Sequence, residues 1–162
     1  MTNKFDNTVK IGENVTIKPD VELHYVNIGN NVSIGKNTTI FGSKSHIVTI
    51  EDNTYISPNC YFNGAFGLFI GKSVTISAGV MIFSDSGPNI GPLKSVFPME
   101  SSVIIIENGC WIGAGSILLP RAYMKENSVL ASNSTLKNSI SSLEVHGGNP
   151  ARYIKKIKLH SK

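Results

Sequence analysis

The chain has 162 residues, with 15 Lys and Arg against 11 Asp and Glu and a net charge of +4. This length predicts one domain over residues 1–162. No apolar run approaches the ~20 residues of a membrane-spanning helix, and the polar N-terminus lacks the apolar segment of a signal peptide, so we expect a cytoplasmic protein. The basic residues gather from Lys137 onwards without interleaved aromatic residues, which argues against nucleic-acid binding.

A large apolar residue recurs with a six-residue period along most of the chain. A short irregular stretch interrupts the period after Ile40, and a long one interrupts it after Ile82. A fixed period of this kind is the signature of a repeat architecture. The residues in phase are Ile11, Ile17, Leu23, Ile28, Ile34, Ile40, Ile50, Ile56, Phe62, Ile70, Ile76, Ile82, Ile106, Ile112, Leu118, Met124, Leu130 and Leu136.

Each six-residue unit has the composition of a short strand followed by a tight corner. Gly often follows the aliphatic residue, a small or β-branched residue comes four positions after it, and Asn is frequent between units. Three units would close one triangular coil, and coils would stack about 4.8 Å apart, which predicts about six coils and a prism roughly 30 Å tall. A β-sandwich is the alternative, but it leaves the common phase unexplained.

The units divide the chain into two groups of coils, over residues 9–83 and 103–140, after a short lead-in. A loop over residues 84–103 holds three of the seven prolines, which argue against a regular helix there. A long loop in a repeat protein is usually functional, although it can also be a tolerated insertion. A connector over residues 141–149 leads to a short C-terminal α-helix, which we expect at about residues 150–159.

Counting coils places the two insertions on the same edge of the prism. Leu23, Ile40, Phe62, Ile82 and Leu118 hold the third position of successive coils, and we expect them to stack on one face. The small insertion after Ile40 and the long loop after Ile82 then leave from one edge. The same count puts Asn63 directly beneath Ser84, which makes this edge the expected rim of a functional site.

Two segments resemble characteristic elements of the hexapeptide-repeat acyltransferases. Residues 106–116, Ile-Glu-Asn-Gly-Cys-Trp-Ile-Gly-Ala-Gly-Ser, resemble the most recognisable coil of that family, and residues 147–152, Gly-Gly-Asn-Pro-Ala-Arg, resemble the element that follows its last coil. The resemblance covers about residues 9–157. It implies an all-β fold, the left-handed parallel β-helix. It also implies a homotrimer with sites between subunits and the transfer of an acyl group from coenzyme A.

The long loop departs from the family pattern, because it has no His where the family carries its general base. Asp85 is the only ionisable side chain from Ser84 to Asn89, and it could be the base if burial made its carboxylate more basic. His24 or His46, or a His of a neighbouring subunit, could instead enter the site. In a third alternative, an amine acceptor attacks without a protein base.

Further residues of the expected site lie in the loop and around the corners of later coils. Asn63, Ser84 and Ser86 are candidates for binding the substrate, although Asn and Ser are also ordinary corner residues. The resemblance implies that pantetheine runs along small corner residues and that basic residues face the cofactor phosphates. The candidates for cofactor binding are Trp111, Gly113, Ala114, Ala131, Ser132, Lys137 and Arg152.

The resemblance therefore predicts an acetyl-CoA-dependent acetyltransferase, without a metal, that acts on a sugar hydroxyl in surface-polysaccharide biosynthesis. An amino group of a nucleotide-linked sugar is the alternative acceptor, and a non-catalytic protein that binds coenzyme A or a sugar is a second alternative. The related γ-class carbonic anhydrases need three convergent His residues, and the four His of this chain lack that spacing.

Overall fold

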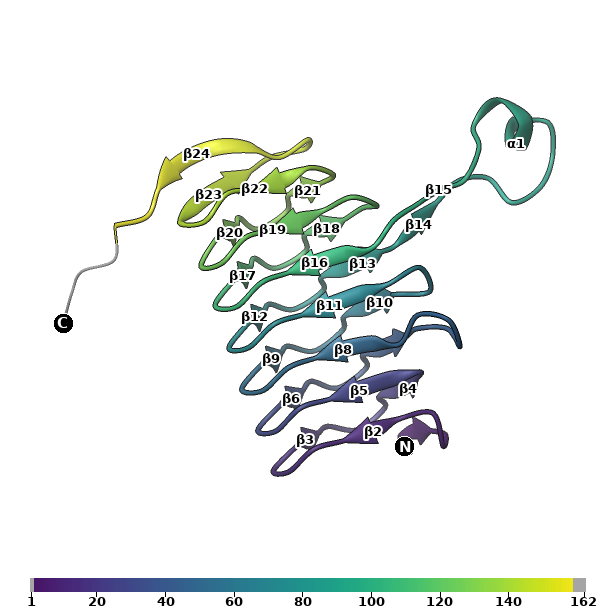
Figure 1. Ribbon diagram of the computed structural model, residues 1–162, viewed down its shortest axis with the longest axis vertical. Coiled ribbons are helices and arrows are strands. Elements are labelled where there is room, and N and C mark those ends of the chain that lie inside the picture. The colour runs from purple at the N-terminus through teal and green to yellow at the C-terminus, as the bar shows by residue number, and fades with distance from the viewer. Residues whose placement is uncertain (1, 159–162) are drawn as a thin grey trace.

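The computed structural model describes residues 2–158, which form a stack of triangular coils (Figure 1). Each coil contributes one short strand to each of three parallel sheets, which we call sheets A, B and C. The fold is a left-handed parallel β-helix, in which the stacked coils agree with the repeat and the handedness agrees with the family resemblance. None of the helices in the described residues is long or apolar enough to cross a membrane.

The strands of the three sheets follow one another in the same rotation through the stack. Sheet A contains β1 (Lys4–Phe5), β4 (Glu22–His24), β7 (Thr39–Phe41), β10 (Tyr61–Asn63), β13 (Met81–Phe83), β18 (Ile117–Leu118) and β21 (Thr135–Leu136). Sheet B contains β2 (Lys10–Ile11), β5 (Val26–Ile28), β8 (Val48–Ile50), β11 (Leu68–Ile70), β16 (Ile104–Ile106), β19 (Tyr123–Met124) and β22 (Ser139–Ile140). Sheet C contains β3 (Thr16–Ile17), β6 (Ser33–Ile34), β9 (Tyr55–Ile56), β12 (Thr75–Ile76), β17 (Trp111–Ile112), β20 (Val129–Leu130), β23 (Glu144–Gly147) and β24 (Arg152–Lys156).

The periodic apolar residues stack directly above one another inside the prism. In sheet A, Ile40 is the register partner of both Leu23 and Phe62, and Ile82 is the partner of both Phe62 and Leu118. All five side chains are fully buried. The predicted stacking on one face is therefore confirmed, and each coil covers the apolar face that its neighbour cannot bury alone.

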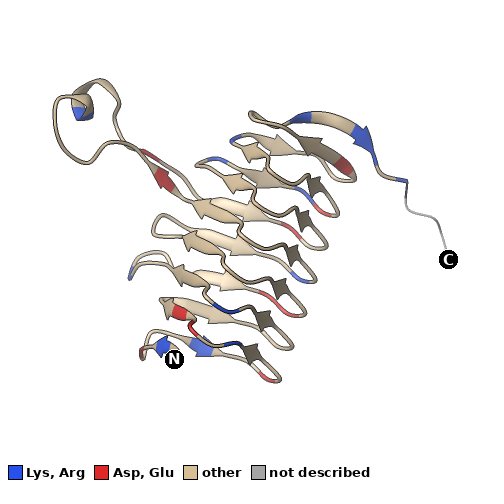
Figure 2. Ribbon diagram, turned by 180° about the vertical axis from the view of Figure 1, so that it is seen from behind, with Lys and Arg blue, Asp and Glu red and all other residues tan. Residues whose placement is uncertain are grey.

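Asparagine at the corners supports the tight turns between strands. Asn14, Asn31 and Asn53 all adopt the left-handed conformation, which Asn tolerates better than most residues. Their side chains also form a ladder, because Asn14 Nδ2 donates to Asn31 Oδ1 and Asn31 Nδ2 donates to Asn53 Oδ1, each at 3.3 Å. Charged residues lie mainly at the corners and at the two ends of the stack, and the strands between them carry few (Figure 2).

The C-terminal end differs from the sequence prediction in two ways. A further turn, formed by β22 and β23, follows the six predicted coils. The predicted C-terminal helix at about residues 150–159 is wrong over its described part, because residues 152–156 form strand β24, which pairs antiparallel with β23. The last parallel strand of a stack presents an unpaired edge, and β24 satisfies the backbone groups of that edge.

The long loop forms a protruding two-stranded arm that we call the hairpin, residues 85–101 (Figure 1). Its base is the antiparallel pair β14 (Asp85–Ser86) and β15 (Glu100–Ser101). Its tip contains the single helical turn α1 (Leu93–Val96), which follows Pro92 and none of whose residues is buried. The prolines thus limit the helix to one turn, as their missing N–H groups and fixed backbone angles require.

The N-terminal lead-in is fastened to the first coil by a cluster of charged side chains. His24 on β4 contacts Asp6 through Nδ1 at 2.8 Å and Glu22 through Nε2 at 3.2 Å. Hydrogen bonds from Thr8 and from His24 lower the pKa of Asp6 to about 2. Hydrogen bonds to Asp6 and Glu22 raise the pKa of His24 above its ordinary 6.5. Lys4 adds a longer contact to Glu22 at 3.9 Å.

These shifts predict a pH window for the attachment of the lead-in. His24 contributes fully to the free energy of unfolding below pH 6.5, and this contribution is lost as pH rises through the raised pKa of the folded state. Asp6 contributes fully above pH 3.8, and its contribution is lost as pH falls towards 2. We expect His24→Gln to lower the melting temperature more at pH 5.5 than at pH 8.5. The control is His46→Gln, because His46 is an exposed histidine outside this cluster. An equal decrease in the melting temperature of His24→Gln at pH 5.5 and pH 8.5 would contradict this attachment.

Candidate functional site

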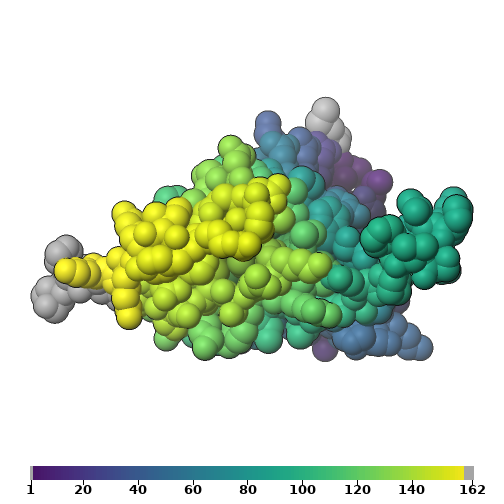
Figure 3. Space-filling model, turned by 90° about the horizontal axis from the view of Figure 1, so that it is seen from above, coloured from purple at the N-terminus to yellow at the C-terminus, as the bar shows by residue number. Residues whose placement is uncertain are grey.

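The predicted site residues gather at two opposite edges of sheet A. We call the corner where the chain passes from sheet C to sheet A the C–A edge, and the corner where it passes from sheet A to sheet B the A–B edge. Gly113 and Ser132 lie at the C–A edge, and Asn63 and Asp85 lie at the A–B edge. Seen from above, β24 and the hairpin project on opposite sides of the prism (Figure 3).

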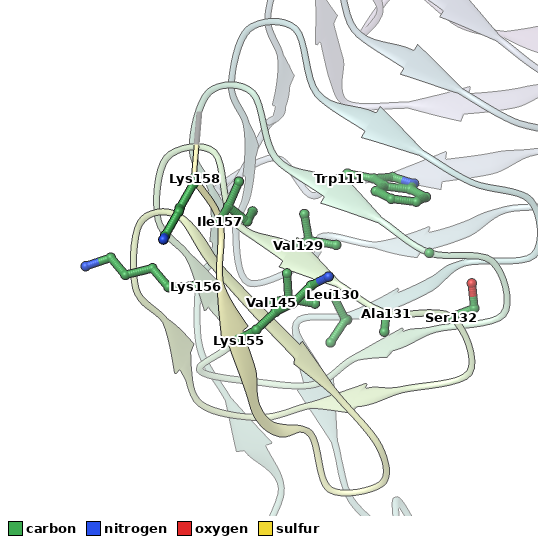
Figure 4. A pocket seen from close by; sticks show the side chains of 11 residues that line it. Trp111, Val129, Leu130, Ala131, Ser132, Val145, Lys155, Lys156, Ile157 and Lys158 are labelled. Atoms are coloured by element: carbon green, nitrogen blue, oxygen red, sulfur yellow. The ribbon is translucent and has the colours of Figure 1, made fainter. Parts of the chain in front are cut away.

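A groove of about 780 Å³ crosses the outer face of sheet C beneath β24 and the residues after it (Figure 4). Its floor is a row of cross-strand neighbours, in which Val129 is the partner of both Trp111 and Val145, and Val145 is the partner of Lys155. The complete lining is Trp111, Gly113, Val129, Leu130, Ala131, Ser132, Val145, Lys155, Lys156, Ile157 and Lys158. The groove is therefore apolar along its floor and basic along one rim.

Trp111 and Lys155 are held at opposite sides of this groove. The Trp111 ring is half exposed, and its Nε1 donates a hydrogen bond of 3.1 Å to the Ser77 hydroxyl, which fixes the plane of the ring. The Lys155 side chain extends across the groove towards Val129 and Leu130 (Figure 4). The backbone N–H of Ile157 donates to the Leu143 carbonyl at 2.7 Å, which fastens the overhanging segment to the last coil.

The corner at the end of the groove offers backbone donors to a ligand. The N–H groups of Gly113 and Ala131 donate to the carbonyls of Leu130 and His146, at 2.8 Å each, and are used within the stack. Among the described residues, the N–H groups of Ala114 and Ser132 have no protein acceptor. Two unpaired amides beside an apolar groove suit a ligand with amide carbonyls along an apolar chain.

The structure brings four of the seven predicted cofactor residues into the groove. Trp111, Gly113, Ala131 and Ser132 line it, and Ala114 is the neighbour of Gly113 at the corner. Lys137 and Arg152 do not line it. Lys137 lies at the A–B edge, where its Nζ contacts Glu100 Oε2 at 2.8 Å, and Arg152 is exposed and donates to the Ala151 carbonyl at 3.1 Å.

The predicted site residues do not include the three lysines that form the basic rim, Lys155, Lys156 and Lys158. The excess of basic residues near the C-terminus was visible, but a helical arrangement of that segment would not place them along sheet C. A strand directs Lys155 to the same outer face as Val145, because register partners in a ladder share a face. Regular alternation could not have found Lys155, because the register shifts in this strand pair and places Tyr153 opposite His146 but Lys155 opposite Val145.

The A–B edge holds a polar pair at the base of the hairpin. Asn63 Nδ2 donates to Asp85 Oδ1 at 2.6 Å, and Asn63 Oδ1 accepts from the Ala65 backbone N–H at 3.0 Å. Both contacts fix the Asn63 amide, so that its donor faces the half-buried carboxylate of Asp85. The arrangement can hold an ionised carboxylate in a defined position at the edge of sheet A.

The two serines of the loop occupy different environments. Ser84 is fully buried, and its hydroxyl accepts from the Phe66 backbone N–H at 3.0 Å, so it shapes the corner and offers no surface to a substrate. Ser86 is exposed and borders a second cavity, above the hairpin base. The register partner of Asn63 is Phe83 rather than Ser84, which corrects the predicted alignment by one residue.

The two histidines near the A–B edge, His24 and His46, contact residues other than Asp85. His24 belongs to the N-terminal attachment and is separated from the hairpin base by three strand spacings, about 14 Å. His46 lies in the small insertion, and its ring is 6.3 Å from that of Phe66, whose backbone N–H contacts Ser84. The two insertions therefore share an edge, as predicted, and His46 is the nearer of the two histidines to Asp85.

The close packing at Gly113 gives a testable consequence. A Cβ atom on Gly113 would lie 2.4 Å from the Ser132 nitrogen and 2.8 Å from the Ala131 carbonyl carbon, both backbone atoms that cannot move independently. We expect Gly113→Ala to lower the free energy of unfolding by about 1–3 kcal/mol in urea denaturation. Ala114, the exposed neighbour of Gly113, provides the control. Ala114→Val should change the free energy of unfolding by less than about 0.5 kcal/mol. Equal effects would contradict this packing.

Comparison with known proteins finds a matching repeat model and related sequences. Residues 47–84 match a family model described as the hexapeptide repeat of succinyl-transferase. The chain is 28% identical over 147 residues to galactoside O-acetyltransferase of Escherichia coli, covering 91% of this chain and 63% of that protein. It is 29% identical to dTDP-4-amino-4,6-dideoxy-D-glucose acyltransferase of Escherichia coli, covering 89% of this chain and 80% of that protein. The chain thus spans less than two thirds of the first of these relatives.

A solved structure shares the whole architecture. AntD, an N-acyltransferase from Bacillus cereus in complex with dTDP and 3-hydroxybutyryl-CoA, superposes with a TM-score of 0.80 at 24% identity, covering 91% of this chain and 82% of that one. This likeness concerns the fold. The chain therefore carries a hexapeptide repeat and is similar in sequence to acyltransferases over most of its length.

Proposed function

We propose that the protein transfers an acetyl group from acetyl-CoA to a hydroxyl of a sugar, as a step in the modification of a surface polysaccharide. The observation that carries this proposal is the groove on sheet C, which combines an apolar floor, a basic rim and two unpaired backbone donors. Coenzyme A requires the same three features for its pantetheine chain, its phosphates and its amides. The free, buried thiols of Cys60 and Cys110 agree with a cytoplasmic location.

Different residues of the groove bind different parts of acetyl-CoA. The N–H groups of Ala114 and Ser132 donate to the amide carbonyls of pantetheine, and Val129 and Val145 cover its apolar atoms. Lys155, with Lys156 and Lys158 at the rim, pairs with the phosphates. Trp111 offers its ring face to the nucleotide or to the chain. When bound, acetyl-CoA supplies the activated thioester that the acceptor attacks.

Asp85 is the residue that we assign as general base. Its carboxylate is held by Asn63 and accepts the proton of the acceptor hydroxyl as that oxygen attacks the thioester carbonyl. The carbon–sulfur bond then breaks, and the thiolate leaves as the thiol of coenzyme A after it takes up a proton. Asn63 acts here through Asp85, as a residue that positions the carboxylate.

The arrangement of the two edges favours a homotrimer with the site between subunits. In one chain the groove and Asp85 lie on opposite sides of sheet A, which keeps a donor in the groove away from the base. A neighbouring copy that presents its A–B edge to the groove would unite them. Tyr61 and Met81 are exposed apolar residues on the outer face of sheet A and provide a surface for that contact.

An amino group of a nucleotide-linked sugar is the second candidate acceptor. The relative that is named as a dTDP-amino-sugar acyltransferase and the fold likeness to AntD favour it. The absence of a loop His also favours it, because an amine that is already deprotonated needs no strong base. An ester product and an amide product are distinguishable, because mild base cleaves only the ester.

The experiment that tests the function combines binding with turnover. Acetyl-CoA is titrated into the protein by calorimetry, and the complex is incubated with panels of sugars and amino sugars while free thiol is followed. Saturable binding with acceptor-dependent thiol release supports the transferase. The absence of acetyl-CoA binding contradicts it, and binding without release over both panels leaves only the non-catalytic alternative.

A matched pair of variants tests the groove. Trp111 and Tyr55 lie on the same face of sheet C and are 51% and 49% exposed, but only Trp111 lines the groove. We expect Trp111→Ala to weaken acetyl-CoA binding by about tenfold in calorimetry, which corresponds to about 1.4 kcal/mol of lost ring contact. Tyr55→Ala should leave the affinity unchanged. Equal affinities of all three proteins would remove the groove assignment.

A second pair tests the base. We expect Asp85→Asn to lower kcat by about 10²–10⁴-fold for a hydroxyl acceptor, because the amide cannot accept the proton. Binding of acetyl-CoA should be unaffected. Asp20→Asn is the control, since Asp20 lies at a left-handed corner of the first coil, where Asn is also tolerated, and lines neither the groove nor the hairpin base. Undiminished kcat in Asp85→Asn would end its assignment as the base.

A further inference from the structure

The second cavity lies between the hairpin and the last coils, on the opposite side of the hairpin base from Asn63. Its volume is about 300 Å³, at the lower end of the range for small-molecule sites. Ser86 and Asp85 are consecutive residues of one strand and point to opposite faces, so the cavity begins one residue from the proposed base. The lining is Ser86, Gly87, Val96, Phe97, Pro98, Glu100, Leu119, Pro120 and Lys137.

An ion pair crosses this cavity from the hairpin to the body of the prism. Glu100 lies opposite Ser86 in the hairpin base, and its Oε2 is 2.8 Å from Nζ of Lys137. Lys137, through both a hydrogen bond and its charge, lowers the pKa of the Glu100 carboxyl, and Arg121 adds a smaller effect in the same direction. Both side chains remain partly exposed, so each keeps hydrogen-bonding capacity towards a ligand.

Apolar side chains form the remaining walls. Leu119 and Pro120 border the cavity on the side of the coils, and Val96, Phe97 and Pro98 border it on the side of the hairpin. Val96 and Phe97 are 66% and 60% exposed, which is high for apolar residues next to a cavity. The cavity therefore presents an acceptor of hydrogen bonds, a donor and an apolar surface that includes one aromatic ring.

We propose that this cavity binds a neutral pyranoside of the saccharide acceptor, the unit next to the one whose hydroxyl faces Asp85 on the other side of the hairpin base. A sugar ring presents hydroxyl groups at its edge and C–H groups on its faces. Glu100 accepts from one hydroxyl, Lys137 donates to another, and the C–H face packs on Phe97. This assignment rests on the proposed function and gives Lys137 a role towards the sugar rather than the cofactor phosphates.

The charge balance of the cavity selects among sugars. The ammonium of Lys137 is already neutralised by Glu100, so the pair offers no net positive charge to a carboxylate or a phosphate. An acidic sugar would instead place its charge beside the Glu100 carboxylate, which is unfavourable. We therefore expect neutral glycosides to bind here more tightly than acidic ones of the same ring size.

Binding of glycosides without the donor tests the proposal. Saturation-transfer NMR is used to titrate methyl β-D-galactopyranoside and methyl β-D-glucuronide against the full chain. We expect the neutral glycoside to bind, and its Kd to rise by about tenfold or more in Glu100→Gln and in Lys137→Met. The control is Lys94→Met, because Lys94 lies in α1 and does not line the cavity. Equal Kd values in all four proteins, or preference for the glucuronide, would overturn the proposal.

A charge reversal separates binding from simple attachment of the hairpin. The double variant Glu100→Lys with Lys137→Glu restores the ion pair but moves the donor and the acceptor to each other's positions. Hydrogen exchange at Ser102, whose N–H donates to the Ser84 carbonyl at 2.9 Å, reports whether the hairpin base is intact. Restored protection with weak glycoside binding supports direct contact, whereas full recovery of both shows that the pair only holds the hairpin.

The cofactor titration keeps this inference separate from the proposed function. Glu100→Gln and Lys137→Met should bind acetyl-CoA with the affinity of the unmodified protein, because neither residue lines the groove. Acetyl-CoA binding without any glycoside binding would overturn the acceptor subsite and leave the transferase standing. Glycoside binding without acetyl-CoA binding would overturn the transferase alone.

Discussion

The stacking of successive coils determines every other feature of this molecule. Parallel strands hydrogen-bond from coil to coil, and the inward residues of each coil cover those of the next. Neither interaction exists within a single coil, so the stack forms only as a whole. The same repeat fixes the height of each corner, and it thereby places Gly113 against Ser132 and Asn63 beneath the start of the hairpin.

The two edges of sheet A have separate chemistry because the insertions and the terminal strand leave from different corners. The A–B edge carries both insertions, the Asn63–Asp85 pair and the Glu100–Lys137 pair. The C–A edge receives the end of a groove that exists only because β24 and its extension overhang sheet C. A rigid prism keeps these two regions at a constant separation, which is why the proposed reaction calls for a second copy of the chain.

The repeat alone predicted the coils, their phase and the face on which Phe62 and Ile82 stack, because one inward residue per strand leaves a periodic signal. It could not predict the C-terminal strand. Ile154 and Ile157 are three residues apart, which fits one face of a helix, but pairing with the free edge of β23 makes residues 152–156 a strand. The same error hid Lys155 from the predicted site. His146 takes the inward position of β23, where it contacts Glu144 at 3.0 Å, and the buried Ile140 of the same turn is out of the six-residue phase. The Glu100–Lys137 pair joins the hairpin to a coil that is distant in the sequence, so no local sequence pattern predicts it.

The proposed reaction depends most directly on where acetyl-CoA binds, and Trp111 can report that binding. Trp111 is the single tryptophan, it is half exposed, and it forms one wall of the groove. The measurement is acrylamide quenching of its fluorescence during a titration with acetyl-CoA. We expect quenching to fall saturably as the ligand covers the ring. Quenching that stays constant at saturating acetyl-CoA would contradict the location of the donor site.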